Sequence, residues 1–175
     1  DANSKLAQTR SRLKEQNIVK FEKIRLNPHS HDSAQIIQNT RDTRDLMKFQ
    51  DSYFAATDGG LLQLSQEGKL IKHFTVLDGL PESDLISLIV FDAKLFIGTR
   101  TKRIVTFDGE NFTQFHFPEI ETQAVTTFLN DNGRLLVGTF SGGLLEYDSK
   151  VFREIKAENQ TIKTINFLSK IDSTL

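Results

Sequence analysis

Three segments in the middle of the chain repeat one pattern: a short apolar run, a threonine, a turn and a second apolar run. The threonines are Thr57, Thr99 and Thr139, which lie 42 and then 40 residues apart. A fixed period of this length with strand-like content is typical of a repeat architecture, in which each unit buries its faces against its neighbours. The period therefore restricts the fold more than any other feature of the sequence.

Each period holds four predicted strands. Thirteen residues beyond each threonine, a segment of alternating apolar and polar residues begins, at Leu70, Phe112 and Phe152. Eleven residues before each threonine lies a more continuous apolar run, as expected for a strand that is buried on both faces. Turns that carry Gly, Asp or Asn separate most of these strands. Four strands in each period predict the blades of a β-propeller. The predicted blades are residues 45–76, 85–117 and 124–157.

Incomplete units flank these blades. Residues 20–26 match the outermost strand at 151–156, so we expect an outermost strand with no preceding blade. Residues 162–168 are expected to form an innermost strand with no strand after it. The fold class predicted for residues 18–175 is therefore all-β: a partial β-propeller of about three four-stranded blades plus one flanking strand at each end.

The first 17 residues do not share the period of the strands. Leu6 and Leu13 lie seven apart in a polar stretch, which fits either a short amphipathic helix or the remnant of a leader. Because the chain begins at Asp1 without a methionine, we expect that a leader or an upstream region has been removed.

The repeat carries motifs of a known family. They include Gly79-Leu80-Pro81 before the second blade, Asp131-Asn132-Gly133 between strands, and Ser141-Gly142-Gly143-Leu144 after the third threonine. Over residues 45–170 the chain resembles the two-component regulator propeller repeat, a bacterial β-propeller family. The resemblance implies the extracytoplasmic sensory part of a signalling protein, often a histidine kinase that detects a carbohydrate or a similar ligand. Residues 100–103, Arg-Thr-Lys-Arg, depart from the Gly-Gly turn of the family.

We expect the residues of the repeated motif to have a structural role. We expect Gly98 and Gly138 to lie where a side chain would collide with a neighbouring strand. Thr57, Thr99 and Thr139 are expected to form hydrogen bonds within their own blades. No catalytic residue is predicted among them.

A binding face is predicted at the turn between the second and third strand of each blade. Arg100, Lys102 and Arg103 form the densest basic group of the repeats, and the planar guanidinium of arginine suits an anionic ligand or a protein partner. Asp58 and Ser141 occupy the corresponding turns of the other two blades. The connecting loops at 78–84 and 118–123 are expected to open on the same face. A solvated charged turn is the alternative interpretation.

The histidines give no strong signal of chemistry. His29, His31 and Asp32 form a cluster that could ligate a transition metal, but an ordinary surface loop is favoured, so no metal site and no cofactor is predicted. His73 and His116 fall in outermost strands, where histidines are more often solvated or packed than catalytic. No local signature of a Ser-His-Asp site is present.

Composition narrows the function classes. A formal net charge of −1 argues against a broad nucleic-acid interface, and the absence of cysteine excludes disulfides and Cys-ligated zinc. No apolar run is long enough to insert in a membrane.

We therefore expect a non-enzymatic sensing or interaction module, periplasmic or otherwise extracytoplasmic. A propeller lyase or hydrolase with its site at the central channel remains the alternative. The expected partners are a second copy of the chain or further blades of a longer propeller, and a small carbohydrate-like ligand.

Overall fold

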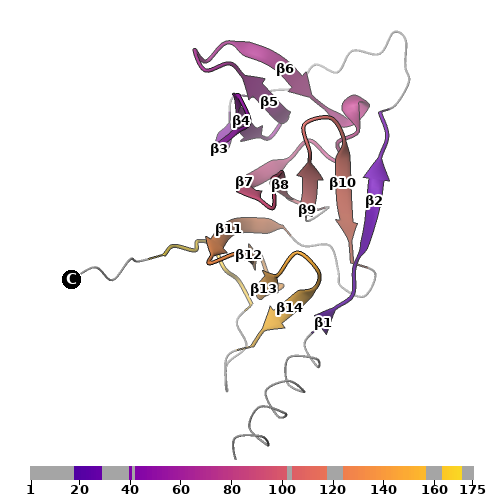
Figure 1. The fold of residues 1–175 in the computed structure, drawn as a ribbon, viewed down its shortest axis with the longest axis vertical. Helices are drawn as coiled ribbons and strands as arrows, with labels where there is room; N and C mark the ends of the chain where they lie inside the picture. Colours follow the sequence, from indigo (N-terminus) through magenta and orange to yellow (C-terminus); the bar gives the residue numbers. More distant parts are fainter. Residues whose placement is uncertain are drawn as a thin grey trace, which may run out of the picture.

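Three antiparallel sheets follow one another along the chain and stand side by side in space (Figure 1). The computed structural model describes residues 18–28, 40, 42–101, 104–117, 124–156 and 163–170. Each sheet contains four consecutive strands, and together they form a partial β-propeller, as the repeat predicts. The expected helix or leader at 1–17 and the cluster of His29, His31 and Asp32 lie outside the described residues.

The strands keep one order in every blade. Blade one consists of β3 (Thr43–Phe49), β4 (Ser52–Thr57), β5 (Gly60–Leu64) and β6 (Leu70–Phe74). A short 3-10 turn, η1 (Val76–Asp78), leads to blade two, which consists of β7 (Leu85–Phe91), β8 (Lys94–Thr99), β9 (Ile104–Phe107) and β10 (Phe112–His116). Blade three consists of β11 (Val125–Asp131), β12 (Arg134–Thr139), β13 (Leu144–Tyr147) and β14 (Phe152–Ile155).

Tight hairpins set the register of the inner strands. The loop between β11 and β12 has only two residues, Asn132 and Gly133, and both have positive φ, at 52° and 80°. This is the backbone of a type I′ turn, whose twist matches that of the two strands that it joins. Asp92 and Ala93 adopt the same backbone between β7 and β8. In blades two and three, the same type of turn therefore joins the first strand to the second.

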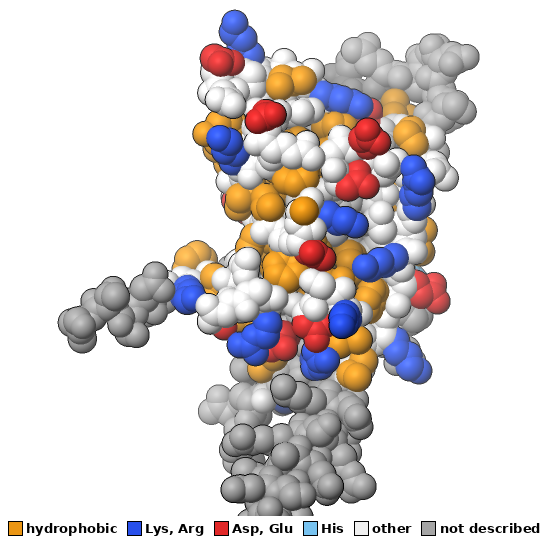
Figure 2. All heavy atoms as spheres, in the orientation of Figure 1, with side chains coloured by type: hydrophobic (Ala, Val, Ile, Leu, Met, Phe, Trp, Pro, Cys, Tyr) orange, Lys and Arg blue, Asp and Glu red, His pale blue; other side chains and the backbone are white. Residues whose placement is uncertain are grey.

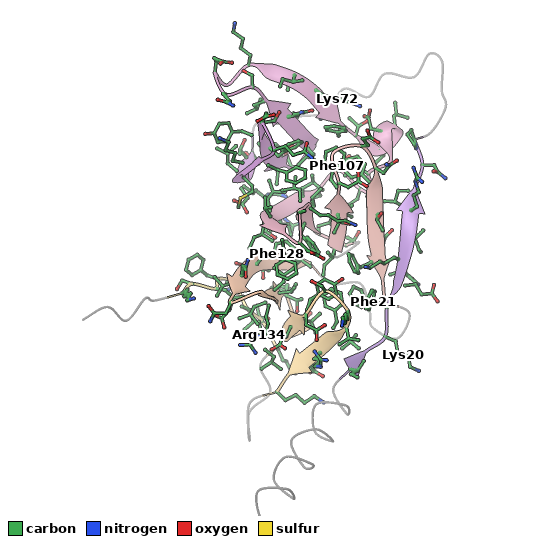
Figure 3. All side chains as sticks on the ribbon, viewed as in Figure 1. Lys20, Phe21, Lys72, Phe107, Phe128 and Arg134 are labelled. Atoms are coloured by element: carbon green, nitrogen blue, oxygen red, sulfur yellow. The ribbon has the colours of Figure 1, made fainter. Side chains whose placement is uncertain are left out.

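The apolar side chains form two separate cores, one in each gap between blades. The core between blades one and two includes Phe54 and Phe74 from one sheet and Leu95 and Phe107 from the other. Figure 3 labels Phe107, which lies in the gap between these two sheets. The core between blades two and three includes Phe96 and Phe115 facing Tyr147 and Phe152. Burial of both faces of blade two explains why its strands are almost continuously apolar.

The segment before blade one runs across the outer edges of blades two and three, in place of the isolated outermost strand that we expected. β1 (Ile18–Val19) pairs with β14, and β2 (Glu22–Leu26) pairs with β10 as a fifth antiparallel strand. We call residues 18–26 the strap. The charged residues of the strap are exposed, whereas Val19 and Leu26 pack against the two cores. This apolar side allows the strap to pair with the outer edges of β10 and β14.

The strap also contributes an aromatic anchor. Phe21 lies between β1 and β2, and its ring centroid is 5.2 Å from that of Phe115 and 5.1 Å from that of Phe152. Figure 3 shows Phe21 directed toward blades two and three, whereas Lys20 points away from them. One side chain thus joins the outer strands of two blades.

Residues 163–170 lie against the outward side of blade three, where we expected an innermost strand. Ile165 donates its backbone N–H to the carbonyl of Thr139, and its side chain lies over Gly138, where an added Cβ would come within 2.7 Å of it. In the same way, a Cβ on Gly98 would come within 2.8 Å of Val125, the first residue of β11. Both glycines are therefore required by a close approach from the next element of the chain. The segment occupies the place of a first strand but is not part of a regular sheet, because among the described residues no second strand follows it.

Candidate functional site

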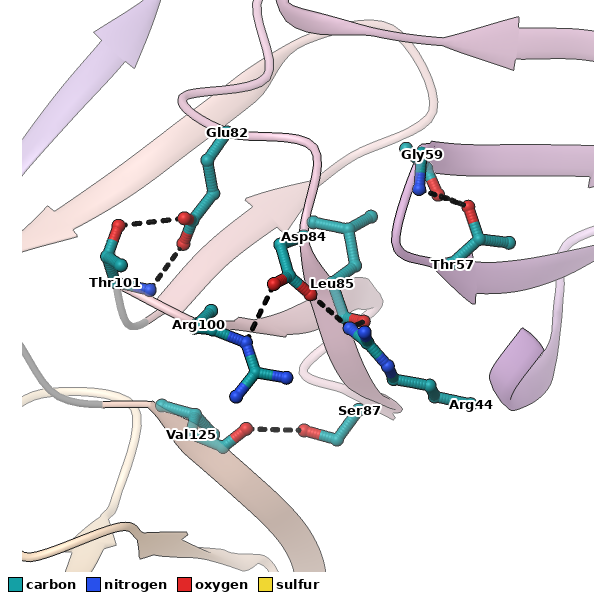
Figure 4. A network of polar contacts seen from close by, with 11 residues as sticks. Arg44, Thr57, Gly59, Glu82, Asp84, Leu85, Ser87, Arg100, Thr101 and Val125 are labelled. Atoms are coloured by element: carbon teal, nitrogen blue, oxygen red, sulfur yellow. Dashed lines mark hydrogen bonds and ion pairs between the residues drawn. The ribbon is translucent and has the colours of Figure 1, made fainter. Parts of the chain in front are cut away.

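The candidate site lies at the loop end of the junction between blades one and two (Figure 4). Three parts of the chain meet there: the start of β3, the loop that connects η1 to β7, and the turn that follows β8. The loop at 78–84 and this turn were expected on the same face, and their contacts confirm it. The backbone N–H of Arg100 donates to the carbonyl of Asp84 at 3.0 Å, which fixes the end of β8 to the connecting loop.

Asp84 is the centre of the polar network. Its carboxylate accepts from Arg44 of blade one on one side and from the Nε of Arg100 of blade two on the other, the latter at 2.7 Å. Partial burial alone would raise the pKa of Asp84, but the hydrogen bonds and charges of the two guanidinium groups together outweigh it and lower the pKa. Asp84 is therefore ionised at neutral pH and holds the two arginines at fixed positions. Arg44 also donates to the carbonyl of Leu85 at 2.9 Å.

A second carboxylate fixes the turn after β8. Glu82 accepts from both the backbone N–H and the hydroxyl of Thr101, each at 2.7 Å. Glu82 bonds to Thr101 and Asp84 bonds to Arg100. The connecting loop therefore holds two successive residues of the turn. The main chain at Arg100 is thus held in place, although the side chain of Arg100 is 53% exposed.

The terminal nitrogens of Arg100 are the most available donors of this network. Its Nε is directed at Asp84, and the described residues provide no hydrogen-bond partner for either terminal nitrogen. In Figure 4 these two nitrogens point away from the carboxylate of Asp84. A guanidinium held in this way presents a planar pair of donors, the geometry that binds carboxylate or sulfate groups in a bidentate manner.

The turn of blade two differs from those of blades one and three. The hydroxyl of Thr57 donates to the carbonyl of Gly60 at 2.8 Å, and that of Thr139 donates to the carbonyl of Gly143 at 2.9 Å. Within-blade hydrogen bonding is therefore confirmed for these two threonines. For Thr99, the described residues provide no partner for the buried hydroxyl, so the expected bond is not seen. The turn that it would close belongs to residues 102 and 103, and the predicted site residues Lys102 and Arg103 lie outside the described residues.

The structure places the other two predicted site residues apart from this network. Asp58 is half-buried, and one of its carboxylate oxygens is buried without a hydrogen-bond partner. Ser141 is exposed, and its N–H donates to the hydroxyl of Thr164 at 3.3 Å. Within the described residues, no hydrogen bond or ion pair joins Asp58 or Ser141 to Arg100. Of the five predicted residues, Arg100 alone is seen in the network.

Sequence reasoning missed three members of the site, Arg44, Glu82 and Asp84. Arg44 lies in an innermost strand, and nothing in its own blade indicates that it bonds to the next one. The available signal was the register: Arg44 is followed 42 residues later by Ile86, beside the carbonyl of Leu85 that it reaches. An arginine at a position that is apolar in the next repeat suggests a specific polar partner across the gap.

The remaining candidates for chemistry give no second site. His73 uses its Nε2 in a hydrogen bond of 2.8 Å with the carbonyl of Gly59, so it supports a turn, and His116 is exposed at the outer strand of blade two. In the part of the chain that the structure describes, no three His, Asp or Glu side chains gather in a way that could hold a metal ion. The same residues contain no helix of the length and apolar character needed to span a membrane.

Two solved structures of bacterial extracellular domains share the fold of this chain. The chain is similar to the extracellular domains of the hybrid two component systems BT3049 and BT4673, both from B. thetaiotaomicron. The first is 19% identical with a TM-score of 0.58 and covers 72% of this chain. The second is 20% identical with a TM-score of 0.54 and covers 67%. The chain spans only 17% of the length of either domain. No family model matches the chain, and no curated protein matches it in sequence.

Proposed function

We propose that the chain is a non-enzymatic sensing module that belongs to the extracytoplasmic part of a bacterial signalling protein. Its ligand is a small carbohydrate-like molecule that carries a carboxylate or sulfate group, bound at the loop face between blades one and two. The observation that carries the proposal is the guanidinium of Arg100, which Asp84 holds by its Nε while both terminal nitrogens face away.

Recognition depends on orientation more than on long-range charge. The two arginines of the network are balanced by Asp84 and Glu82, and the whole chain has a formal net charge of −1. A broad positive field that would attract any anion is therefore not expected. A fixed pair of donors instead favours a planar acidic group, and hydroxyl groups of a sugar would complete the contact through the exposed turn residues.

The same network offers a way to transmit binding. Asp84 bonds to Arg44 in blade one and to Arg100 in blade two, so a ligand that pulls on Arg100 changes the contact between the blades. A signalling role agrees with the similar structures, which are extracellular domains of two component systems. The output is a movement between neighbouring blades, which passes to elements beyond the loop face.

Isothermal titration calorimetry with galacturonate oligosaccharides, and with neutral galactose oligosaccharides of the same length, tests the proposal. We expect saturable binding of the acidic sugar only, and a loss of about tenfold to a hundredfold in affinity for Arg100→Gln, because a hydrogen bond to a charged group contributes about 1.5–3 kcal/mol. Arg134→Gln is the matched control, since Arg134 is 51% exposed and lies on blade three. Equal binding of both sugars, or equal losses in the two variants, would show that Arg100 does not recognise the acidic group.

A further inference from the structure

The face of blade one that points away from blade two is apolar and uncovered. Successive side chains of a strand point to opposite faces of its sheet, and residues paired across strands point to the same face. Leu46 pairs with Ala55 and Ala55 with Leu62, while Tyr53 pairs with Leu64. These side chains lie opposite to those of the core between blades one and two. We call this set the outward face of blade one: Leu46, Tyr53, Ala55, Leu62, Leu64 and Leu70.

The other two blades show what the corresponding face contacts. In blade two the corresponding residues, at the same positions relative to the paired strands, all belong to the core against blade one. They are Leu88, Leu95, Ile97, Val105, Phe107 and Phe112, and none is more than 3% exposed. In blade three the corresponding residues all belong to the core against blade two. They are Phe128, Leu135, Val137, Leu145, Tyr147 and Phe152.

Blade one has the same apolar pattern, but among the described residues no neighbouring blade packs against its outward face. Leu46 is 53% exposed and Leu70 is 61% exposed, and Ile71 beside them is exposed as well. None of the six residues is charged, but Lys48, which pairs with Tyr53 and is exposed, lies on the same face beside them. A sheet face of this composition is the kind of surface that packs against another sheet.

The outward side of blade three does not fit this face in a head-to-tail arrangement. Where blades one and two present Phe49 and Phe91 to their neighbours, blade three has Asp131. Beside it, Arg134 bonds to Glu146 at 3.1 Å, and residues 163–170 lie over Gly138. Figure 3 shows Arg134 on the side of blade three that points away from blade two. Packing an uncharged sheet on these ion pairs would desolvate them without new partners. The face of blade one is therefore better matched by an uncharged surface.

We propose that the outward face of blade one packs on the same face of a second copy of the chain. A two-fold axis brings identical patches together, so the six uncharged residues meet an equally uncharged patch, and the packing has to leave the ammonium group of Lys48 beside them in solvent. Two sheets at about −30° and about 10 Å apart are the usual geometry of such packing. One blade face is small for a specific interface, so the dimer should dissociate on dilution.

Sedimentation velocity over about 1–200 μM tests the dimer. We expect the sedimentation coefficient of the unmodified chain to rise with concentration, and Leu62→Lys to lower the association constant at least tenfold. Leu136→Lys is the matched control, because Leu136 is also half-buried but lies on the outward side of blade three. The control should associate as the unmodified chain does. Circular dichroism verifies that both variants fold, and Leu46→Lys replaces Leu62→Lys if the latter does not.

The other outcomes contradict the proposal. An unmodified chain that stays monomeric throughout would show that something other than a second copy covers the face, such as a blade from another polypeptide. Association that is lost in both Leu62→Lys and Leu136→Lys would identify a head-to-tail contact between blades one and three, and association that is lost in Leu136→Lys alone would place the contact on blade three. No sugar is present in this experiment, so its result is independent of the ligand proposed for Arg100.

Discussion

The two gaps between blades are held together in different ways. Between blades one and two, an aromatic and aliphatic core is supplemented by polar bonds: Arg44 to Asp84 at the loop end, and Asp45, which accepts from the backbone N–H of Leu88 at 2.7 Å. Between blades two and three, the strap inserts Phe21 among the rings of the core.

Charged residues lie over the surface with both signs interspersed, and apolar side chains show between them (Figure 2).

The difference indicates which gap is suited to change. An ion pair at an exposed edge contributes little to stability and responds to ligands, salt and pH. Clusters of contacting aromatic rings, which are close-packed and tolerate little displacement, lie in both gaps, so the ion pairs at the loop end are the part of the first junction that can respond. The candidate site lies at the polar edge of the first gap, so a ligand bound there, as proposed above, would act on the ion pairs of that junction, while the strap joins blades two and three.

The largest effect is expected for Phe21→Ala. Removal of a half-buried aromatic ring that contacts two blades should lower the free energy of unfolding by about 2–4 kcal/mol, near the lower part of the range for buried phenylalanines. Leu26→Ala is the matched change at the first gap, where the strap adds one aliphatic side chain, and about 1–2 kcal/mol is expected. Urea unfolding followed by circular dichroism measures both. Equal losses would mean that the strap serves the two gaps alike.

Replacement of two of the repeated threonines by valine is expected to change the free energy of unfolding by smaller amounts and in opposite directions. Thr57→Val removes a hydroxyl that donates to Gly60 and accepts from the N–H of Gly59 at 3.1 Å, so a loss of about 1–2 kcal/mol is expected. Thr99→Val removes a buried hydroxyl that has no partner among the described residues, so stability should stay the same or rise by up to about 1 kcal/mol. The same urea titration checks the signs. A loss in Thr99→Val as large as in Thr57→Val would show that the hydroxyl of Thr99 does have a partner in solution.

The repeat made the fold predictable, because its period fixes the number of strands and their order within a blade. Gly98 was expected to be needed for a close approach, and the contact with Val125 confirms this. The strap was not foreseen. Residues 20–26 were rightly seen to resemble an outer strand, but sequence similarity does not tell which sheet edge a strand joins. That choice depends on the apolar side of the strap, where Phe21 and Leu26 fit gaps that exist only after the blades have packed.

The candidate site was predictable only in part, for a related reason. Arg100 stood out because it begins the basic run at 100–103 that stands in place of the Gly-Gly turn of the repeat, which is a local signal. Asp84 and Arg44 are ordinary charged residues in their own segments, and their role arises from a bond across two blades. Side chains that meet only through tertiary packing leave no periodic trace in the sequence.

Acid should act on the first gap before the second. The pKa of Asp84 is lowered in the folded chain, and the hydrogen bond from Arg153 lowers the pKa of Asp148 on blade three to about 2. A lowered pKa contributes stability that is present above the unfolded value of about 3.9 and is lost as the pH falls through the folded value. Each carboxylate is partly exposed, so each should contribute no more than about 1 kcal/mol.

The two carboxylates differ in what their protonation loosens. Protonation of Asp84 removes the ion pairs at the loop end of the first gap, whereas Asp148 bonds to Arg153 within blade three, so its loss leaves the strap and its rings in contact. Between pH 4 and pH 2, hydrogen exchange corrected for intrinsic rates should rise first in β3 and β7. Asp84→Asn should show this faster exchange already at pH 6, and Asp148→Asn should not. Faster exchange that starts in β11 and β14 would reverse the assignment of the weaker junction.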